Sequence, residues 1–369
     1  MMTTDMQRVV DAVRAFERGE IVVVTDDNDR ENEGDLIVSA EHATTEKMAF
    51  IIRHTSGIVC APLTREAARR LNLTPMVADN DAPHSTAFTV SVDFRHGTTT
   101  GISAEERCNT VRALANPNAG AGDFVRPGHV FPLIARDGGV LMRSGHTEAC
   151  VDLCKLAGLK TVGVLAELVN DNGTVKRGAE IDAFATEHGL RSVSVADLIA
   201  YRQRNERLVE RVAEFPIQTK SGPAHAVAYR TEWDAMQQLA IVFGDIRNGK
   251  SVPVRLQLES VADDVFGADS ALDKIIARFA KTGSGVIVYL REGSVGVART
   301  AMRTRDGVSE ERHASAAARD AEWREIGLGA QILRDLGVTT IRLLASRERR
   351  YVGIDGFGIA IEATEIIEG

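Results

Sequence analysis

An acidic stretch between two apolar runs holds the most reactive pattern of side chains in this 369-residue sequence. Residues 26–36 read DDNDRENEGDL and place six carboxylates within ten positions. Like charges this close repel, so the stretch is costly to fold unless a cation neutralises it. In extended backbone, Glu31, Glu33 and Asp35 would share one face. The pattern indicates a hard-metal or acid–base site, and a solvated acidic turn is the alternative interpretation.

Three other polar positions are suited to chemistry. Residues 97–103, rich in glycine and hydroxyl groups, precede a predicted helix, and free N–H groups at a helix start favour an anion such as phosphate. An ordinary N-cap is the alternative. His146 stands just before a helix predicted from Ala149, where it is placed to act as a ligand, a proton carrier or a simple cap. Glu167 ends an apolar strand, so its carboxylate must be paired or poised as a base.

Composition narrows the class of protein. The sequence is 44% hydrophobic and 26% charged, as in ordinary globular proteins. A net charge of -8 without a long basic run argues against a general nucleic-acid binder. The N-terminus lacks a signal-peptide pattern and no run approaches the roughly 20 apolar residues of a membrane span, so we expect a cytoplasmic protein with no membrane partner. The i, i+4 pair Cys150 and Cys154 predicts buried apolar side chains rather than a disulfide or a metal site.

The positions of predicted strands and helices indicate two domains. A chain of this length is about two domains long, and both halves mix predicted strands with predicted helices. We therefore expect an α/β (α+β) fold of two domains, each a mixed β-sheet packed with helices. The predicted boundaries are a first domain at 1–208, a linker at 209–223 and a second domain at 224–369.

The first half of the sequence resembles 3,4-dihydroxy-2-butanone 4-phosphate synthase. The matching segments cover nearly all of residues 6–205 and are 26–36, 86–93, 99–107, 127–133, 143–159 and the strand of Glu167 with the turn 170–174. The acidic motif followed by RxGHTEA is highly specific. The resemblance implies a lyase that converts ribulose 5-phosphate to 3,4-dihydroxy-2-butanone 4-phosphate and formate. It also implies Mg²⁺ or Mn²⁺, two ions per active site, and a homodimer.

The resemblance also assigns roles position by position. Metal binding falls to Glu31 and His146. The catalytic positions are Glu33, Cys60, His129 and Glu167. The substrate-binding positions are Arg30, Glu31, Asp35, Thr100, Arg143, Ser144, Gly145, His146, Thr147 and Glu167. One departure is Ser85, where the family often has glycine.

The second half resembles GTP cyclohydrolase II around residues 254–267. Ser260, Ala271 and Asp273 stand where that family has its three zinc cysteines. A thiolate zinc site activates water in that family, and one Ser, one Ala and one Asp do not form such a site. We therefore expect no zinc and no cyclohydrolase activity.

Other family positions in the second half are mixed. Residues 290–296 lack the second catalytic-loop arginine, and residues 345–348 replace an Asn-Asn-Pro turn. Glu322 and Arg324 do align with the family's acid–base Asp and Arg. Two alternatives stay open: a bifunctional enzyme that also hydrolyses GTP, and a nucleotide-sensing or oligomerisation module.

Overall fold

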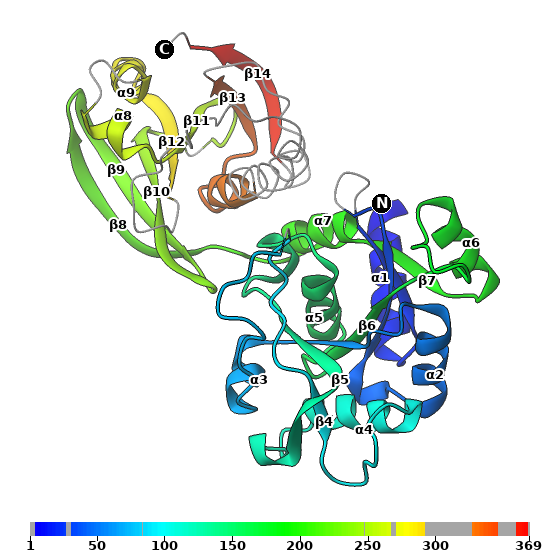
Figure 1. Cartoon of the computed structure of the whole chain (residues 1–369). Helices are drawn as coiled ribbons and strands as arrows, with labels where there is room; N and C mark the ends of the chain where they lie inside the picture. The colour runs from blue at the N-terminus through cyan, green and yellow to red at the C-terminus, as the bar shows by residue number, and fades with distance from the viewer. Residues whose placement is uncertain are drawn as a thin grey trace, which may run out of the picture. The chain divides into compact units, whose positions relative to one another are not determined.

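The chain, described here from a computed structural model, forms two compact units (Figure 1). The described residues up to Tyr201 belong to the first unit, and those from Arg202 belong to the second. The structure describes residues 4–26, 31–82, 84–246, 248–266, 271–291, 327–345 and 359–367. Each unit packs helices on a mixed sheet, which confirms the predicted fold class. In these residues no helix has both the length and the apolar character needed to span a bilayer.

The sheet of the first unit contains seven strands within its described residues. In spatial order they are β4 (Val92–Phe94), β5 (Phe124–Ile134), β3 (Cys60–Leu63), β6 (Gly163–Glu167), β2 (Gly34–Ser39), β1 (Val22–Thr25) and β7 (Arg191–Ser194). β1 and β7 run parallel, as do β3 and β5, and the other neighbours are antiparallel. β1 and β2 are runs of buried apolar residues because helices cover both faces of the sheet.

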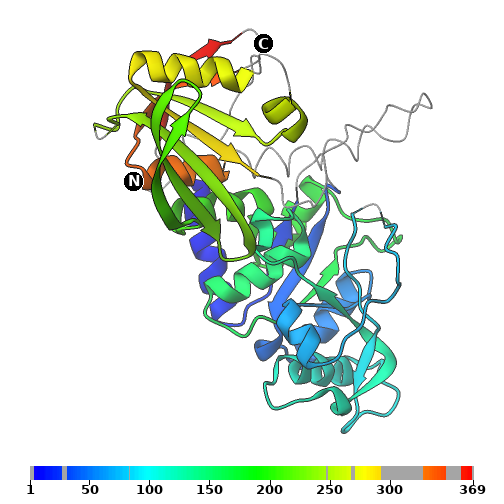
Figure 2. The ribbon, with the colours of Figure 1, turned by 90° about the vertical axis from the view of Figure 1, so that its left-hand side faces the viewer.

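Helices cover the two faces of this sheet differently. α1 (Thr4–Glu17) and α5 (His146–Leu156) pack against each other and on one face (Figure 1, Figure 2). On the opposite face, α2 (Thr45–His54) and α4 (Ala104–Ala115) enclose the main apolar core. Shorter helices complete the unit: α3 (Arg65–Arg70), α6 (Ala179–Glu187) and the first part of α7 (Val195–Asn205).

The second unit also has a seven-stranded sheet within its described residues. The order is β14 (Ala360–Ile366), β13 (Thr340–Ala345), β11 (Val252–Leu258), β12 (Ser284–Leu290), β10 (Asp234–Gly244), β9 (Gly222–Thr231) and β8 (Glu210–Thr219). The first four are parallel and the last three antiparallel. α9 (Ala271–Thr282) packs on one face and the helical residues 327–335 on the other, while α8 (Val261–Phe266) follows β11.

The linker predicted at 209–223 is not a linker. Most of it forms β8, and its last residues begin β9. β8 is the edge strand and pairs along its length with β9. Its side chains are mostly exposed, so it lacks the apolar alternation that marks a half-buried strand. Backbone hydrogen bonds hold an edge strand whatever its side chains are, which is why the pattern did not reveal it. The units divide between Tyr201 and Arg202 rather than at residue 208.

Candidate active site

One face of the first sheet brings together predicted residues that are distant in sequence. Asp35 of β2 pairs directly with Glu167 of β6, and Cys60 of β3 pairs with Leu165. Cross-strand partners point to the same side and side chains alternate along a strand. Asp35, Cys60 and Glu167 therefore share one face, and α5 packs on β2, β3 and β6.

The polar surroundings of Glu167 and Cys60 differ. Ser56 donates its hydroxyl to Glu167 Oε2 at 2.9 Å and its backbone N–H to the Glu167 carbonyl at 2.9 Å. Cys60 is buried, and burial, followed by the charges of Glu167 and Asp35, raises the pKa of its thiol. Cys60 is therefore a neutral thiol at physiological pH and not a thiolate nucleophile.

The helix over this face begins at His146, three residues before the predicted start at Ala149. Gly145 is the N-cap and makes no side-chain cap hydrogen bond. His146 and Thr147 are buried, so the first turn of α5 lies against the sheet rather than in solvent. The free N–H groups and the dipole of a helix N-terminus stabilise nearby negative charge, which suits the acidic residues gathered here.

Three side chains meet at this helix start. Ligand atoms of Asp26, Glu31 and His146 lie within 4.8 Å of one another. His146 Nδ1 is 3.9 Å from Glu31 Oε2 and 3.9 Å from Asp35 Oδ1. His84 Nε2 lies 3.4 Å from the other carboxylate oxygen of Glu31. The structure thus brings together the two predicted metal ligands, Glu31 and His146.

Asp26 is a member of this cluster that the sequence did not single out. Its Oδ2 accepts the backbone N–H of Glu31 at 3.2 Å, and its Oδ1 accepts that of Glu33 at 2.9 Å. Asp26 N–H donates in turn to the Glu33 carbonyl at 3.3 Å. The side chain is 8% exposed. Asp26 therefore closes the acidic loop on itself and aims Glu31 at His146. Its membership of the DDNDREN motif was the only sequence signal for it.

Asp35 is a buried carboxylate among other acids. It is 2% exposed, and its Oδ1 has no hydrogen-bond partner among the residues that the structure describes. Burial, then the charges of Glu167 and Glu31, raise the pKa of Asp35 well above its usual value. A buried acceptor atom beside two carboxylates and an imidazole fits a divalent cation, because hard cations prefer oxygen ligands and would relieve this repulsion.

Glu33 is turned toward a different partner. Arg177 Nη2 donates to Glu33 Oε1 at 3.2 Å. Burial raises the pKa of Glu33, while this hydrogen bond opposes the rise. Asn32 has a φ of 55°, so residues 31–35 do not follow the regular alternation of a strand, and β2 begins only at Gly34. Glu31 and Asp35 therefore both approach His146, as a shared face predicts, whereas Glu33 pairs with Arg177 instead.

Arg143 is held in a network of its own. Its Nη1 donates to Glu148 Oε2 at 2.6 Å, and its Nε and Nη2 both donate to the His84 carbonyl at 3.2 Å. Nη2 also donates to Thr86 Oγ1 at 2.9 Å. Arg143 thereby ties the segment around His84 to the start of α5. Ser144, between Arg143 and the N-cap, is half-buried.

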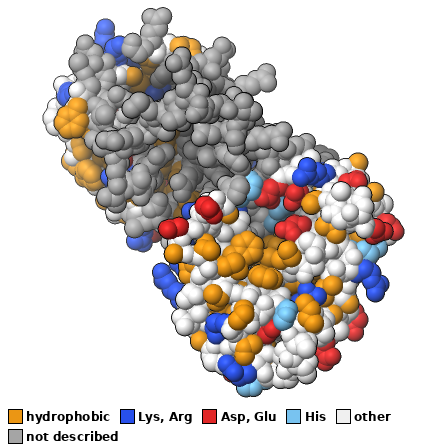
Figure 3. Space-filling view, viewed as in Figure 1, with side chains coloured by type: hydrophobic (Ala, Val, Ile, Leu, Met, Phe, Trp, Pro, Cys, Tyr) orange, Lys and Arg blue, Asp and Glu red, His pale blue; other side chains and the backbone are white. Residues whose placement is uncertain are grey.

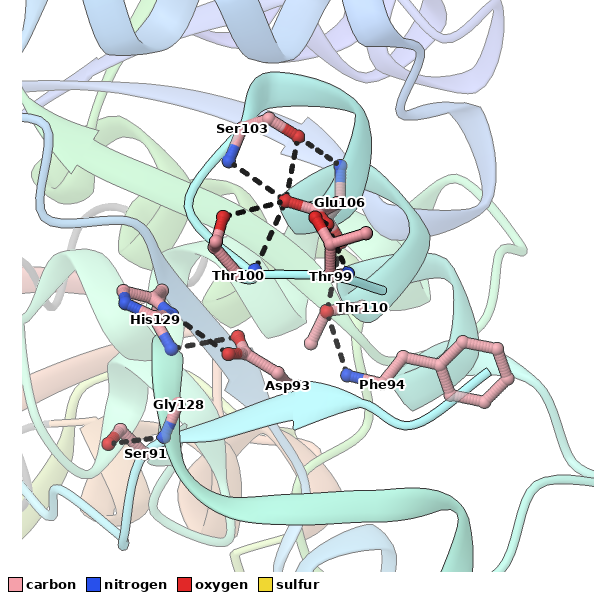
Figure 4. A network of polar contacts seen from close by, with 11 residues as sticks. Ser91, Asp93, Phe94, Thr99, Thr100, Ser103, Glu106, Thr110, Gly128 and His129 are labelled. Atoms are coloured by element: carbon pink, nitrogen blue, oxygen red, sulfur yellow. Dashed lines mark hydrogen bonds and ion pairs between the residues drawn. The ribbon is translucent and has the colours of Figure 1, made fainter. Parts of the chain in front are cut away.

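Thr100 and His129 lie in a second polar network, drawn in Figure 4. Asp93 accepts hydrogen bonds from His129, and Glu106 accepts them from the loop that holds Thr100. These bonds hold Glu106 as a carboxylate, with a pKa lowered to about 2, mainly by Thr99 and Ser103. Within the described residues, neither Thr100 nor His129 is hydrogen-bonded to the cluster of Asp26, Glu31 and His146. Of the predicted site residues, Arg30 lies outside the described residues.

The surface of the first unit has charged and apolar side chains in neighbouring areas. In the space-filling view, acidic and histidine side chains gather beside an apolar patch (Figure 3). Four large apolar side chains of this unit are about half exposed: Ile58, Met76, Val77 and Ile102. Ile102 follows Gly101 in the Thr100 loop, and Ile58 follows Gly57, whose carbonyl accepts a hydrogen bond from Arg107.

The second unit has other side chains at the expected cysteine positions. Both carboxylate oxygens of Asp273 accept hydrogen bonds from the Lys220 ammonium at 3.1 Å. The backbone N–H of Ser260 donates to Asp264 at 2.9 Å. Tyr289 donates its hydroxyl to the same Asp264 oxygen at 2.7 Å. All four cysteines of the chain precede residue 155. A zinc thiolate site therefore does not fit here. Gly267, Glu322, Arg324 and most of 290–296 and 345–348 lie outside the described residues.

Comparison with known proteins covers both units. A family model for 3,4-dihydroxy-2-butanone 4-phosphate synthase matches residues 10–201, and one for GTP cyclohydrolase II matches residues 210–366. The riboflavin biosynthesis protein RibBA of Salinispora arenicola is 44% identical over 97% of this chain and 88% of its own length. The bifunctional riboflavin biosynthesis protein RIBA 1, chloroplastic, of Arabidopsis thaliana is 44% identical over 97% of this chain and 68% of its own length.

Solved structures give two further similarities. RibBX, described as a two-domain 3,4-dihydroxy-2-butanone 4-phosphate synthase from A. baumannii, has a TM-score of 0.79 and 37% identity, over 98% of this chain and 99% of that one. A 3,4-dihydroxy-2-butanone 4-phosphate synthase in complex with two magnesium ions has a TM-score of 0.52 and 49% identity. It covers 53% of this chain and 96% of its own.

Proposed function

This chain belongs to the 3,4-dihydroxy-2-butanone 4-phosphate synthase family, and we propose that its first unit converts ribulose 5-phosphate to 3,4-dihydroxy-2-butanone 4-phosphate and formate. The observation that carries the proposal is the cluster of Asp26, Glu31 and His146 beside the buried Asp35. The product would feed riboflavin biosynthesis, as the names of the relatives indicate.

The metal of this site is Mg²⁺ or Mn²⁺. Glu31 and His146 would hold it, as the family resemblance implies, and Asp26 is close enough to be a third ligand. One of the similar structures carries two magnesium ions, which supports two ions here as well. When bound, such a cation acts as a Lewis acid that stabilises negative charge on substrate oxygens.

The remaining predicted residues divide by position. Glu167, held by Ser56, faces the cluster with its carboxylate and is a candidate for moving substrate protons, together with Glu33 and His129. Cys60 is a neutral thiol that lines the site. Substrate oxygens and phosphate would be held by Arg30, Glu31, Asp35, Thr100, Arg143, Ser144, Gly145, His146, Thr147 and Glu167.

This arrangement suits the chemistry of the reaction. Enolisation next to a ketone, loss of water, rearrangement and release of formate each move a proton or place charge on an oxygen. Glu167 and Asp35 stand on the sheet, and His146 stands above it at the N-terminus of α5. A substrate bound beside them would meet carboxylates and an imidazole that can move its protons, and dipolar groups that stabilise charge on its oxygens. Burial of these groups strengthens both kinds of interaction.

The second unit, we infer, lacks cyclohydrolase activity. Its cysteine positions hold Ser260, Ala271 and Asp273, and Asp273 is engaged by Lys220. Asp264 accepts hydrogen bonds from the Ser260 N–H and the Tyr289 hydroxyl in the same region. RibBX, which also has two domains, is described as a 3,4-dihydroxy-2-butanone 4-phosphate synthase. The bifunctional RIBA 1 relative favours the alternative, in which this unit hydrolyses GTP.

A binding role is the remaining candidate for the second unit. Nucleotide sensing would appear as a GTP-dependent rise in thermal stability without turnover, because a ligand that binds only the folded state stabilises it. Oligomerisation is the other form of this role.

We also propose that the first unit forms a homodimer. Ile58 and Ile102 are large apolar side chains that are about half exposed, and Ile102 lies in the loop of Thr100. Light scattering coupled to size-exclusion chromatography should give twice the chain mass. Ile102→Asp should shift this mass toward that of the monomer. A mass of one chain for both the parent and the variant would refute the dimer.

The decisive experiment measures formate released from ribulose 5-phosphate by the full chain. Formate should appear with Mg²⁺ or Mn²⁺ and cease with excess chelator. Glu31→Gln and His146→Ala should abolish release while circular dichroism stays unchanged, and the exposed Glu187→Gln should behave as the parent does. Near-normal release from either site variant would defeat the metal assignment. The same protein incubated with GTP and Zn²⁺ should leave GTP intact, and GTP consumption would establish the bifunctional alternative.

A further inference from the structure

The hydrogen bonds between Asp93 and His129 determine which nitrogen of the histidine ring carries its proton. We propose that Asp93 is a positioning residue that keeps His129 Nε2 free to accept a proton. The inference rests on the proposed function, in which His129 handles a substrate proton. It concerns a residue of β4 that lies 36 positions from His129 in sequence, ends the matching segment 86–93 and was assigned no role there.

The two oxygens of Asp93 have different partners. Oδ1 accepts the backbone N–H of His129 at 2.8 Å, and Oδ2 lies 2.8 Å from His129 Nδ1 (Figure 4). A backbone N–H is always a donor, so the partner of Oδ1 cannot change. An ionised carboxylate only accepts hydrogen bonds, so Nδ1 must carry the ring proton. Nε2 is then left with a lone pair, and in Figure 4 this nitrogen points away from Asp93.

The Asp93 carboxylate is buried beside a glycine and an arginine. Asp93 is 4% exposed, whereas the His129 side chain is 41% exposed. Gly101, with a φ of 85°, covers the bond so closely that a β-carbon there would overlap Asp93 Oδ2 and lie 2.8 Å from His129 Nδ1. The guanidinium of Arg107, also buried, attracts Asp93 electrostatically. The Asp93 carboxylate therefore faces two hydrogen-bonding nitrogens of His129 and a nearby guanidinium.

The chemical consequence is that His129 acts as a base through one defined atom, Nε2. His129 takes a substrate proton at Nε2 and becomes an imidazolium whose Nδ1–H still donates to the Asp93 carboxylate. The same proton returns from Nε2 to an oxygen or carbon of the substrate in a later step, so the pair ends unchanged. Asp93 holds the tautomer and stabilises the charged ring without taking up a proton itself.

Asp93→Asn reverses this arrangement without changing the shape of the side chain. The backbone N–H of His129 still requires an acceptor, so the amide oxygen must take the place of Oδ1. The amide NH₂ then faces Nδ1 and donates to it, which forces the ring proton onto Nε2. The basic nitrogen is lost, although the imidazole stays where it was. Ser91→Ala is the matched control, because Ser91 Oγ accepts the N–H of Gly128 in the same strand but does not touch the ring.

The test combines a spectrum with a rate, both on the full chain. Nitrogen-15 NMR of histidine-labelled protein, with the His129 signals identified by His129→Gln, should report Nδ1–H in the parent and in Ser91→Ala, and Nε2–H in Asp93→Asn. Formate release should fall about 100-fold or more in Asp93→Asn, the scale of general acid–base catalysis. Ser91→Ala should stay within about twofold of the parent.

Each outcome separates this inference from the proposed function. An unchanged tautomer in Asp93→Asn overturns the inference, even if the rate falls, because a merely structural role lowers activity without moving the proton. A switched tautomer with a normal rate also overturns it. No formate from the folded parent protein refutes the proposed function, whereas the NMR result still decides whether Asp93 sets the tautomer.

Discussion

The guanidinium of Arg143 and the carboxylate of Glu148 meet directly over the α-carbon of Gly145. Their atoms Nη1 and Oε2 are 2.6 Å apart, and both side chains are largely buried. A β-carbon on residue 145 would overlap Arg143 Nη1 and lie 2.9 Å from Glu148 Oε2. The backbone φ of Gly145 is -115°, so glycine is needed here for space and not for an unusual conformation.

Gly145→Ala should therefore break this ion pair. Arg143 can swing away because the overlap involves the end of its side chain. Glu148 would then be left buried, with the N–H of Arg136 as its one remaining partner in the described part of the chain. We expect a loss of about 1–3 kcal/mol in the free energy of unfolding. Denaturant titration measures it. Gly122→Ala, where a β-carbon meets nothing within 4 Å, is the control and should leave stability unchanged.

Asp26→Asn should weaken metal binding. An amide can accept only one of the two N–H groups, from Glu31 and Glu33, that Asp26 now accepts, so the loop that aims Glu31 would loosen. Residues that orient metal ligands typically change affinity 10- to 100-fold, and we expect roughly that loss. Calorimetric titration with Mn²⁺ would measure the dissociation constant. Affinity equal to the parent's would show that Asp26 neither binds the ion nor positions Glu31, and Glu17→Gln provides the comparison for lost charge alone.

Glu106→Gln should raise KM more than it lowers kcat. Glu106 accepts hydrogen bonds from Thr99, Gly101 and Ser103, which together hold the loop of Thr100. A neutral amide presents N–H groups to some of these donors, so the loop loses its fixed shape. If Thr100 holds the substrate, we expect KM for ribulose 5-phosphate to rise roughly tenfold with kcat little changed. A fall in kcat at constant KM would contradict a purely binding role for this loop.

The folded protein should lose stability below pH 6.5 through His54. This ring lies among Phe50, Phe184 and His188, with centroids 4.5, 5.4 and 5.1 Å away. Burial lowers the pKa of His54, and His188, Arg53 and Lys176 lower it further, although Asp171 opposes them. Below pH 6.5, His54 therefore takes up a proton more readily in the unfolded chain than in the folded one. Stability falls as the pH drops through the pKa of His54 in the folded protein.

Melting temperatures between pH 7.5 and 5.0 test this expectation. His54→Phe keeps an aromatic ring in the cluster but cannot titrate, so its melting temperature should fall less over this range than the parent's. Phe50→Leu weakens the same packing without removing the titrating group, so its curve should run parallel to the parent's. Parallel curves for His54→Phe and the parent would assign the pH dependence to other residues.

Local sequence patterns were sufficient for much of the site and the fold class. Glu31 and His146 stand in compact motifs that resemble those of a known family, which assigns both to metal binding, and the structure brings them within 3.9 Å. The apolar runs around the acidic loop predicted β1 and β2, because burial on both faces demands such runs. These features depend on neighbours in sequence, so the sequence carries them directly.

Other features depend on contacts between residues that are far apart in the sequence, which local patterns do not predict. The Glu33–Arg177 pair joins residues 144 positions apart, and the turn at Asn32 takes Glu33 out of the alternation that the motif predicted. Asp93 and His129 meet only because β4 and β5 are neighbours in the sheet. The sequence pattern did not predict β8, because this edge strand is held by backbone pairing with β9 and its side chains are mostly exposed. Residue types therefore determined which chemistry this protein can carry, whereas long-range strand pairing and close packing decided which side chain serves each partner.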